Sequence, residues 1–148
     1  MRRIIRHTLW IILPVLMATL LSGCFAGEEI TFVSEGNTYS VEGLTALGAS
    51  VDKPSFAGAP VADAAGLRQS ALTALRRDST TTALADLLTD TFPPKVRSVP
   101  YYAELAQVDN KDAWIVIEVW GPSEGRLDNS RIWAFDKDTD GVIVSTVF

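Results

Sequence analysis

The chain has 148 residues, of which 47% are apolar and 21% charged, enough for one domain with a buried core and too apolar for a disordered or low-complexity fibre. Its 18 acidic side chains outnumber the 13 basic ones, so nucleic acid is disfavoured as a partner. One cysteine and one histidine exclude an internal disulfide and a cysteine-based zinc cluster.

The first 24 residues have the composition of an export signal. Three arginines among the first seven residues precede an apolar run over 8–20, which is shorter than the roughly 20 residues of a membrane-spanning helix. The following Leu21-Ser22-Gly23-Cys24 resembles the lipobox of bacterial lipoproteins. This resemblance implies that the thiol of Cys24 receives a diacylglycerol group and that the peptide before it is removed. Cleavage by the ordinary signal peptidase and an uncleaved signal anchor are the alternatives.

The lipobox divides the chain into a type II signal peptide (1–23), a lipidated cysteine with a short tether (24–28) and one α+β domain (29–148). The expected location is the extracytoplasmic face of the cell membrane. Without the signal peptide, ten basic side chains remain against eighteen acidic ones, so the lipid anchor and not a basic face is expected to hold the domain at the membrane. This part has no histidine, which excludes a Ser-His-Asp or Cys-His catalytic group.

The domain begins with two short strand patterns. Residues 30–33 and 38–41 alternate apolar with polar side chains around Ser34-Glu35-Gly36-Asn37, a turn composition, which predicts an N-terminal β-hairpin. Residues 43–60 are rich in Gly, Ala, Ser and Pro and predict a loop of about 17 residues. This loop is either a spacer or a functional segment.

Two amphipathic helices are expected next. Asp63 can cap a helix of about 15 residues, and Asp78 or Ser79 can cap a shorter one that Pro93-Pro94 ends. The apolar side chains recur at spacings of three and four, namely Ala64, Leu67, Ala71 and Leu75 in the first helix and Leu84, Leu87, Leu88 and Phe92 in the second. The pair predicts a helical hairpin whose leucines pack in the core, with a docking face as the alternative.

The remaining chain predicts four strands, over 99–105, 113–120, 131–135 and 142–148, with a turn at 109–112. The expected fold is therefore α+β, with a helical hairpin packed on an antiparallel β-meander of about four strands and an N-terminal β-hairpin. This order of elements resembles the cystatin-like cones and the nuclear transport factor 2-like cones. The Phe-Asp-x-x-Thr-x-Gly-x-Ile pattern from Phe135 resembles a hairpin of PepSY-type domains. Neither resemblance implies a functional residue.

The strand over 113–120 is apolar on both faces and carries one charge. Ile115, Ile117 and Val119 point to one side, while Glu118 shares the other side with two tryptophans. Burial of an unpaired carboxylate is costly, and Arg131 on the next strand is a candidate cross-strand partner. The candidate binding surface is Trp114, Glu118, Trp120, Arg131 and Trp133, and core packing of the tryptophans is the alternative.

Asp136, Asp138, Asp140 and Gly141 match the first half of a calcium loop. The bidentate glutamate of such loops would fall on Val147, so the metal prediction is none, with the three aspartates as a weak candidate. A polar hairpin turn with Gly141 in the left-handed conformation is the competing interpretation.

The sequence singles out no pair of carboxylates for catalysis and no cofactor motif, so we expect a protein that is not an enzyme and carries no cofactor. The expected function is a membrane-anchored, non-catalytic binding or accessory module of the bacterial cell envelope. Its expected partners are the membrane, through Cys24, and another envelope protein. The alternative is a carrier of an apolar small ligand between helices and sheet.

Overall fold

Six strands form one mixed sheet in the computed structural model, which describes residues 30–34, 36–92 and 97–148. The α+β class is confirmed. The signal peptide, Cys24 and Pro93-Pro94 lie outside the described residues. In chain order the elements are β1 (Thr31–Val33), β2 (Thr38–Tyr39), α1 (Leu44–Ser50), a 3-10 turn (Val61–Asp63), α2 (Ala64–Leu75), α3 (Thr82–Thr91), β3 (Ser98–Val108), β4 (Lys111–Trp120), β5 (Asn129–Asp136) and β6 (Val142–Val147).

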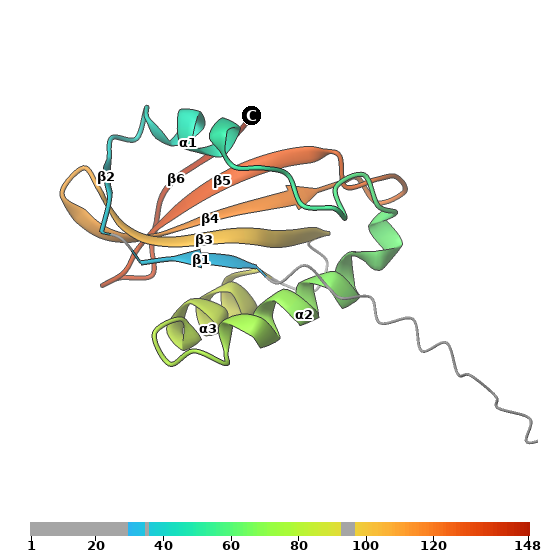
Figure 1. The fold of residues 1–148 in the computed structure, drawn as a ribbon, viewed down its shortest axis with the longest axis horizontal. Coiled ribbons are helices and arrows are strands. Elements are labelled where there is room, and N and C mark those ends of the chain that lie inside the picture. Colours follow the sequence, from blue (N-terminus) through green and yellow to red (C-terminus); the bar gives the residue numbers. More distant parts are fainter. Residues whose placement is uncertain (1–29, 35, 93–96) are drawn as a thin grey trace, which may run out of the picture.

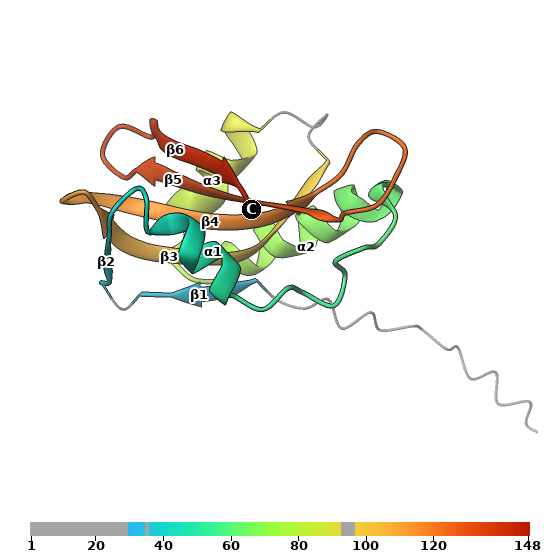
Figure 2. The ribbon, with the colours of Figure 1, turned by 90° about the horizontal axis from the view of Figure 1, so that it is seen from above.

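The sheet lies between two helical layers. Figure 1 shows α2 and α3 on one side of the sheet and α1 on the other, and Figure 2 shows α1 above β3 and β4. Each side has its own core. Helix α1 lies in the segment that the sequence predicted to be a loop, so a helix that the sequence did not indicate covers the second face.

The predicted antiparallel meander is confirmed for β3, β4, β5 and β6, which pair in that order. The turn between β3 and β4 consists of two residues, Asp109 and Asn110, with φ of 48° and 64°. Two left-handed residues are what a type I′ hairpin needs, because this turn matches the twist of the strands. The β4 strand consequently starts at Lys111, two residues earlier than the sequence pattern indicated.

The predicted N-terminal β-hairpin is wrong. Both β1 and β2 pair in parallel with β3, with Thr31 beside Tyr102 and Thr38 beside Gln107, and they do not pair with each other. The alternation of polar and apolar residues identified two strands correctly, but alternation specifies only which face a side chain occupies. It does not specify which neighbouring strand accepts the hydrogen bonds.

The predicted loop over 43–60 contains a helix. Leu44 is fully buried and Leu47 and Val51 are partly buried, a spacing of three and four that places all three on one helical face. Gly48 faces Phe148 so closely that an added Cβ would lie 2.5 Å from the ring. The Gly and Ala content therefore reflects close packing of a short helix as well as irregular chain.

Helices α2 and α3 confirm the two amphipathic predictions, and Asp63 precedes α2 as predicted, but the predicted cap of α3 is wrong. Asp63 occupies the N-cap position of α2 without a side-chain hydrogen bond. The N-cap of α3 is Thr81, neither Asp78 nor Ser79. The Asp78 carboxylate instead accepts hydrogen bonds from the backbone N–H and the hydroxyl of Thr80, at 2.8 and 2.7 Å. It therefore closes the turn that precedes the helix.

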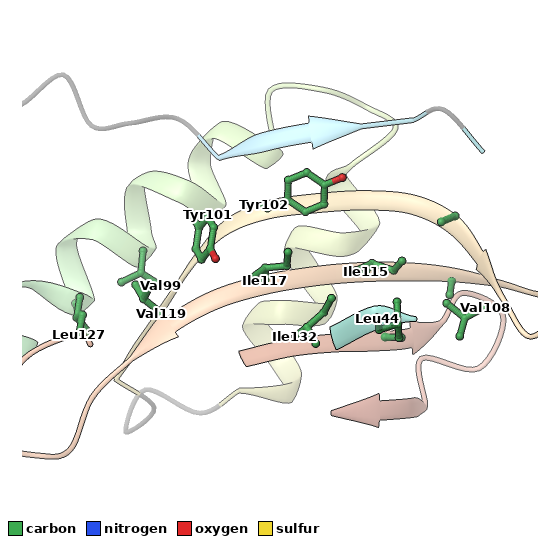
Figure 3. Close-up of a cluster of buried hydrophobic side chains, with 14 of the residues drawn as sticks. Leu44, Val99, Tyr101, Tyr102, Val108, Ile115, Ile117, Val119, Leu127 and Ile132 are labelled. Carbon is green, nitrogen blue, oxygen red and sulfur yellow. The ribbon is translucent and has the colours of Figure 1, made fainter. Parts of the chain in front are cut away.

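Strand β4 separates the two cores as its alternation predicted. Ile115 and Ile117 belong to the core cluster that contains Leu44 of α1 (Figure 3), whereas Trp114 and Val116 belong to the cluster of α2 and α3. A bulge between Pro100 and Tyr102 interrupts the pairing of β3 with β4. No helix among the described residues is long and apolar enough to cross a bilayer.

Candidate functional site

A buried carboxylate lies at the centre of the surface that the sequence singled out. Glu118 of β4 is 1% exposed and faces Arg131 of β5 in the register of the two strands. Its Oε1 accepts hydrogen bonds from Arg131 Nη2 at 2.6 Å, from Arg131 Nε at 3.0 Å and from Trp133 Nε1 at 2.8 Å. Three donors on one oxygen stabilise a charge that would be costly if it were buried alone.

A second arginine approaches the other carboxylate oxygen from α2. Arg68 Nη1 lies 3.9 Å from Glu118 Oε2, and its side chain is only 13% exposed. Arg68 also donates to the carbonyl oxygens of Leu88 at 2.9 Å and Ser98 at 3.3 Å. Burial lowers the pKa of Arg68, and the charge of Glu118 opposes that shift. One carboxylate thus faces two guanidinium groups, which leaves a net charge of +1 in an acidic protein.

Arg131 is held between two indole rings. Its guanidinium carbon lies 4.5 Å from the ring centre of Trp133 and 5.5 Å from that of Trp120. Both tryptophans are half-buried, and Phe92 packs edge-on against Trp133 with ring centres 5.0 Å apart. Stacking fixes the long arginine side chain, so the group presents a rigid, partly exposed surface.

Trp114 does not belong to that surface. It is 3% exposed and packs against Phe32, with ring centres 6.3 Å apart. Core packing, the alternative left open by the sequence, is the correct interpretation for Trp114. The other four candidate residues, Glu118, Trp120, Arg131 and Trp133, come together as one cluster.

The surface continues onto β6, which forms one edge of the sheet. Val147 pairs with Arg131 and Val142 pairs with Phe135, so these valines lie on the α2/α3 side of the sheet. They are 56% and 51% exposed, the largest exposures among the big hydrophobic side chains of the described residues. We call Trp120, Arg131, Trp133, Val142 and Val147 the edge surface.

A second buried carboxylate lies on the opposite face of the sheet. Glu104 of β3 is fully buried and accepts hydrogen bonds from Asn37 Nδ2 at 2.7 Å, Tyr102 Oη at 2.8 Å and Tyr39 Oη at 3.1 Å. All three donors are neutral, and two of them come from β2 and the turn before it. Glu104 therefore ties β2 to the sheet.

The Asp136 loop is a hairpin turn in the structure. The Asp136 carboxylate accepts hydrogen bonds from the backbone N–H groups of Asp138 at 3.0 Å and Thr139 at 3.1 Å. These bonds, the first above all, lower the pKa of Asp136. Asp140 has a φ of 58°, so it and not Gly141 takes the left-handed conformation, which corrects the prediction. No group of three potential metal ligands occurs among the described residues.

Sequence reasoning missed Arg68, Glu104 and the exposure of β6. Arg68 was visible as a charge beside the apolar stripe of α2, but its contact with Glu118 joins residues 50 positions apart. Comparison of the chain with family models, with curated proteins and with solved structures gave no match. The lipoprotein, cone and PepSY resemblances therefore stay predictions.

Proposed function

We propose that the protein is a membrane-anchored lipoprotein whose domain binds another envelope protein through the edge surface, without catalysing a reaction. The anchor rests on the sequence Leu21-Ser22-Gly23-Cys24. The binding role rests mainly on β6, an edge strand with two exposed valines beside a half-buried tryptophan.

The edge of β6 has the features of a pairing site. The strand Val142-Ile-Val-Ser-Thr-Val147 contains no charged side chain and no proline, and its outer edge pairs with no other strand among the described residues. Soluble proteins usually protect such edges with charges, prolines or covering segments, because an open edge adds strands from other chains. An extended segment of a partner could therefore add to β6 by backbone hydrogen bonds.

The neighbouring side chains supply specificity. Arg131 is fixed by Glu118 and by two indole rings, so a partner finds it in one conformation and loses little side-chain entropy on binding. Tryptophan and arginine are the residues that contribute most often to protein interfaces. A partner segment with apolar side chains and a carboxylate or carbonyl acceptor would match Val142, Val147 and Arg131.

The alternative of an apolar-ligand carrier has less support. The space between α2, α3 and the sheet is filled by large buried side chains, of which Leu84, Leu88 and Phe135 are at most 1% exposed. A carrier of a wholly apolar ligand would need an apolar cavity in that layer, whereas the cavity at its end, between α2, α3 and β3, is lined by Arg68 and Arg97.

The anchor and the binding role are tested separately. Replacement of the only thiol in Cys24→Ser is expected to leave the precursor uncut and unlabelled by fatty acid. A variant that is still processed and labelled would contradict the lipoprotein assignment, whatever the domain binds.

For the binding role, a photo-crosslinking residue at position 147 is expected to give one discrete product in cells, with a matched residue at the exposed Thr73 of α2 as control. The same product should weaken strongly when Val142→Lys places a charge on the edge. A product of twice the chain mass would show a second copy on the edge. Equal labelling from position 73 would overturn the proposal.

A further inference from the structure

A pocket opens beside the Glu118 cluster, because Arg68 belongs to the cluster and also lines the pocket. Its volume is about 530 Å³, within the range of small-molecule sites. It is lined by the 3-10 turn, by α2 as far as Leu72, by the end of α3, by the residue before β3 and by the turn after β4. Two of its lining residues are Arg68 and Arg97.

The lining has an unusual charge for this protein. The chain has 18 acidic side chains against 13 basic ones, but no described residue lining the pocket is acidic. Arg68 and Arg131 already outnumber Glu118 by one charge, and Arg97 adds another beside the pocket. Of these three arginines, Arg68 and Arg97 line the cavity, and Arg68 shares its one nearby carboxylate, Glu118, with Arg131.

The two arginines differ in a way that suits ligand binding. Arg68 is held by Leu88, Ser98 and Glu118, so its position is set before any ligand arrives. Arg97 is exposed, and its guanidinium has no hydrogen-bond or ion-pair partner among the described residues, although its backbone carbonyl accepts from Gly121 N–H. Together, Arg68 in a fixed position and Arg97, whose guanidinium group is free among the described residues, can bind an oxyanion, because guanidinium groups bind oxyanions by paired hydrogen bonds.

The rest of the lining is mixed. Val61, Leu72 and Phe92 supply apolar surface, while Gln69 and Thr89 supply polar groups. Such a lining fits a ligand with a short apolar part next to its charge. We propose that this pocket binds a small amphiphilic anion, with its carboxylate or phosphate group at Arg68 and Arg97.

The proposal does not depend on the partner at the edge surface. The anionic group could belong to a soluble acid or to an anionic lipid of the membrane. The two sources share one chemistry and differ in how the ligand is supplied.

The test uses the full chain in phosphatidylcholine nanodiscs, titrated calorimetrically with hexyl phosphate and with inorganic phosphate. Hexyl phosphate is expected to bind, and inorganic phosphate more weakly, because it lacks the apolar part. Arg97→Gln should weaken the binding of hexyl phosphate about tenfold, since a charge-assisted pair is lost. Arg77→Gln removes the same charge just beyond the far end of α2 and should leave binding unchanged.

A second variant tests the cavity without changing its charge. Ala65 is exposed and lines the pocket, so Ala65→Trp is expected to fill the space and abolish binding while α2 stays folded. A parallel arm replaces part of the phosphatidylcholine with phosphatidylglycerol and adds no soluble anion. A rise in melting temperature there, lost in Arg97→Gln, would identify the lipid as the source, and binding of hexyl phosphate alone would identify a soluble acid. Absence of binding in both arms, or equal losses in Arg77→Gln and Arg97→Gln, would overturn the proposal.

Discussion

Glu104 and Glu118 are both almost completely buried, on opposite faces of the same sheet, and only Glu118 is paired with cations. Glu118 contacts Arg131 at 2.6 Å, with Arg68 at 3.9 Å, while Glu104 is surrounded by neutral donors. The same side chain therefore has two structural roles. One carboxylate neutralises arginines, and the other satisfies hydroxyl and amide groups.

This difference predicts unequal costs for the same substitution. Glu118→Gln removes the charge that compensates two guanidinium groups, so we expect a loss of about 2 to 3 kcal/mol of unfolding free energy, below the 3 to 5 kcal/mol of fully buried pairs because both arginines retain some contact with water. Glu104→Gln keeps the shape and an acceptor for the neutral donors, and is expected to cost about 1 kcal/mol or less. Urea unfolding of the two variants measures both values. A larger loss in Glu104→Gln would contradict this account.

A second prediction contrasts two glycines. At Gly121 an added Cβ would overlap the backbone carbonyl oxygen of Arg126, in the turn that pairs with the chain near Pro60. Backbone cannot move aside as a flexible side chain can, so Gly121→Ala is expected to cost about 1 to 3 kcal/mol or more. Gly66 lies in α2 with no atom near its Cβ position.

The matched variant Gly66→Ala should raise the unfolding free energy by about 0.5 to 1 kcal/mol, because alanine restricts the unfolded chain and favours the helix. Thermal unfolding of both variants gives the comparison. Equal changes at the two positions would show that the close approach at Gly121 does not control stability.

The Glu118–Arg131 pair was predictable because it follows from strand periodicity. Two strands joined in order by a short connection pair antiparallel, and charged residues on the same face then meet. Arg68 could not be placed in this way, because its contact depends on how α2 lies across β4. A helix pattern specifies which face is buried, but it does not specify which residue of the sheet that face meets.

The errors in the fold have the same origin. The patterns at 30–33 and 38–41 predict two strands, which the structure has as β1 (Thr31–Val33) and the shorter β2 (Thr38–Tyr39), but the predicted pairing of each with its nearest strand in sequence is wrong. The contacts of Glu104 with Asn37 and Tyr39 hold this segment against β3. These polar contacts join residues more than 60 positions apart, and no local pattern contains them.

The calcium prediction follows from the geometry of Asp136. Its Oδ1 accepts two backbone hydrogen bonds, and its Oδ2 lies 3.9 Å from Lys111 Nζ. Both carboxylate oxygens therefore already have partners within the protein and would have to give them up to bind calcium. We expect the same melting temperature in chelator and in about 1 mM calcium, the range of weak extracellular sites. A calcium-dependent rise that Asp136→Ala removes would contradict this prediction.

The last prediction concerns pH and the same side chain. The pKa of Asp136 is lowered from its ordinary value of 3.8, first by the hydrogen bond from Asp138 N–H and further by Thr139 and Lys111. The folded state therefore binds the proton less tightly than the unfolded state, so the charge stabilises the fold above pH 3.8 and this contribution is lost as the pH falls through the lower, folded pKa.

Asp136→Asn keeps an oxygen acceptor for both N–H groups but has no charge. Its melting temperature should lie below that of the natural chain at neutral pH, and the gap should close on acidification below pH 3.8. Asp138→Asn, where the side chain is exposed, provides the control and should show no such closing gap. A gap of constant size from neutral to acidic pH would mean that the substitution acts through the turn geometry and not through the charge of Asp136.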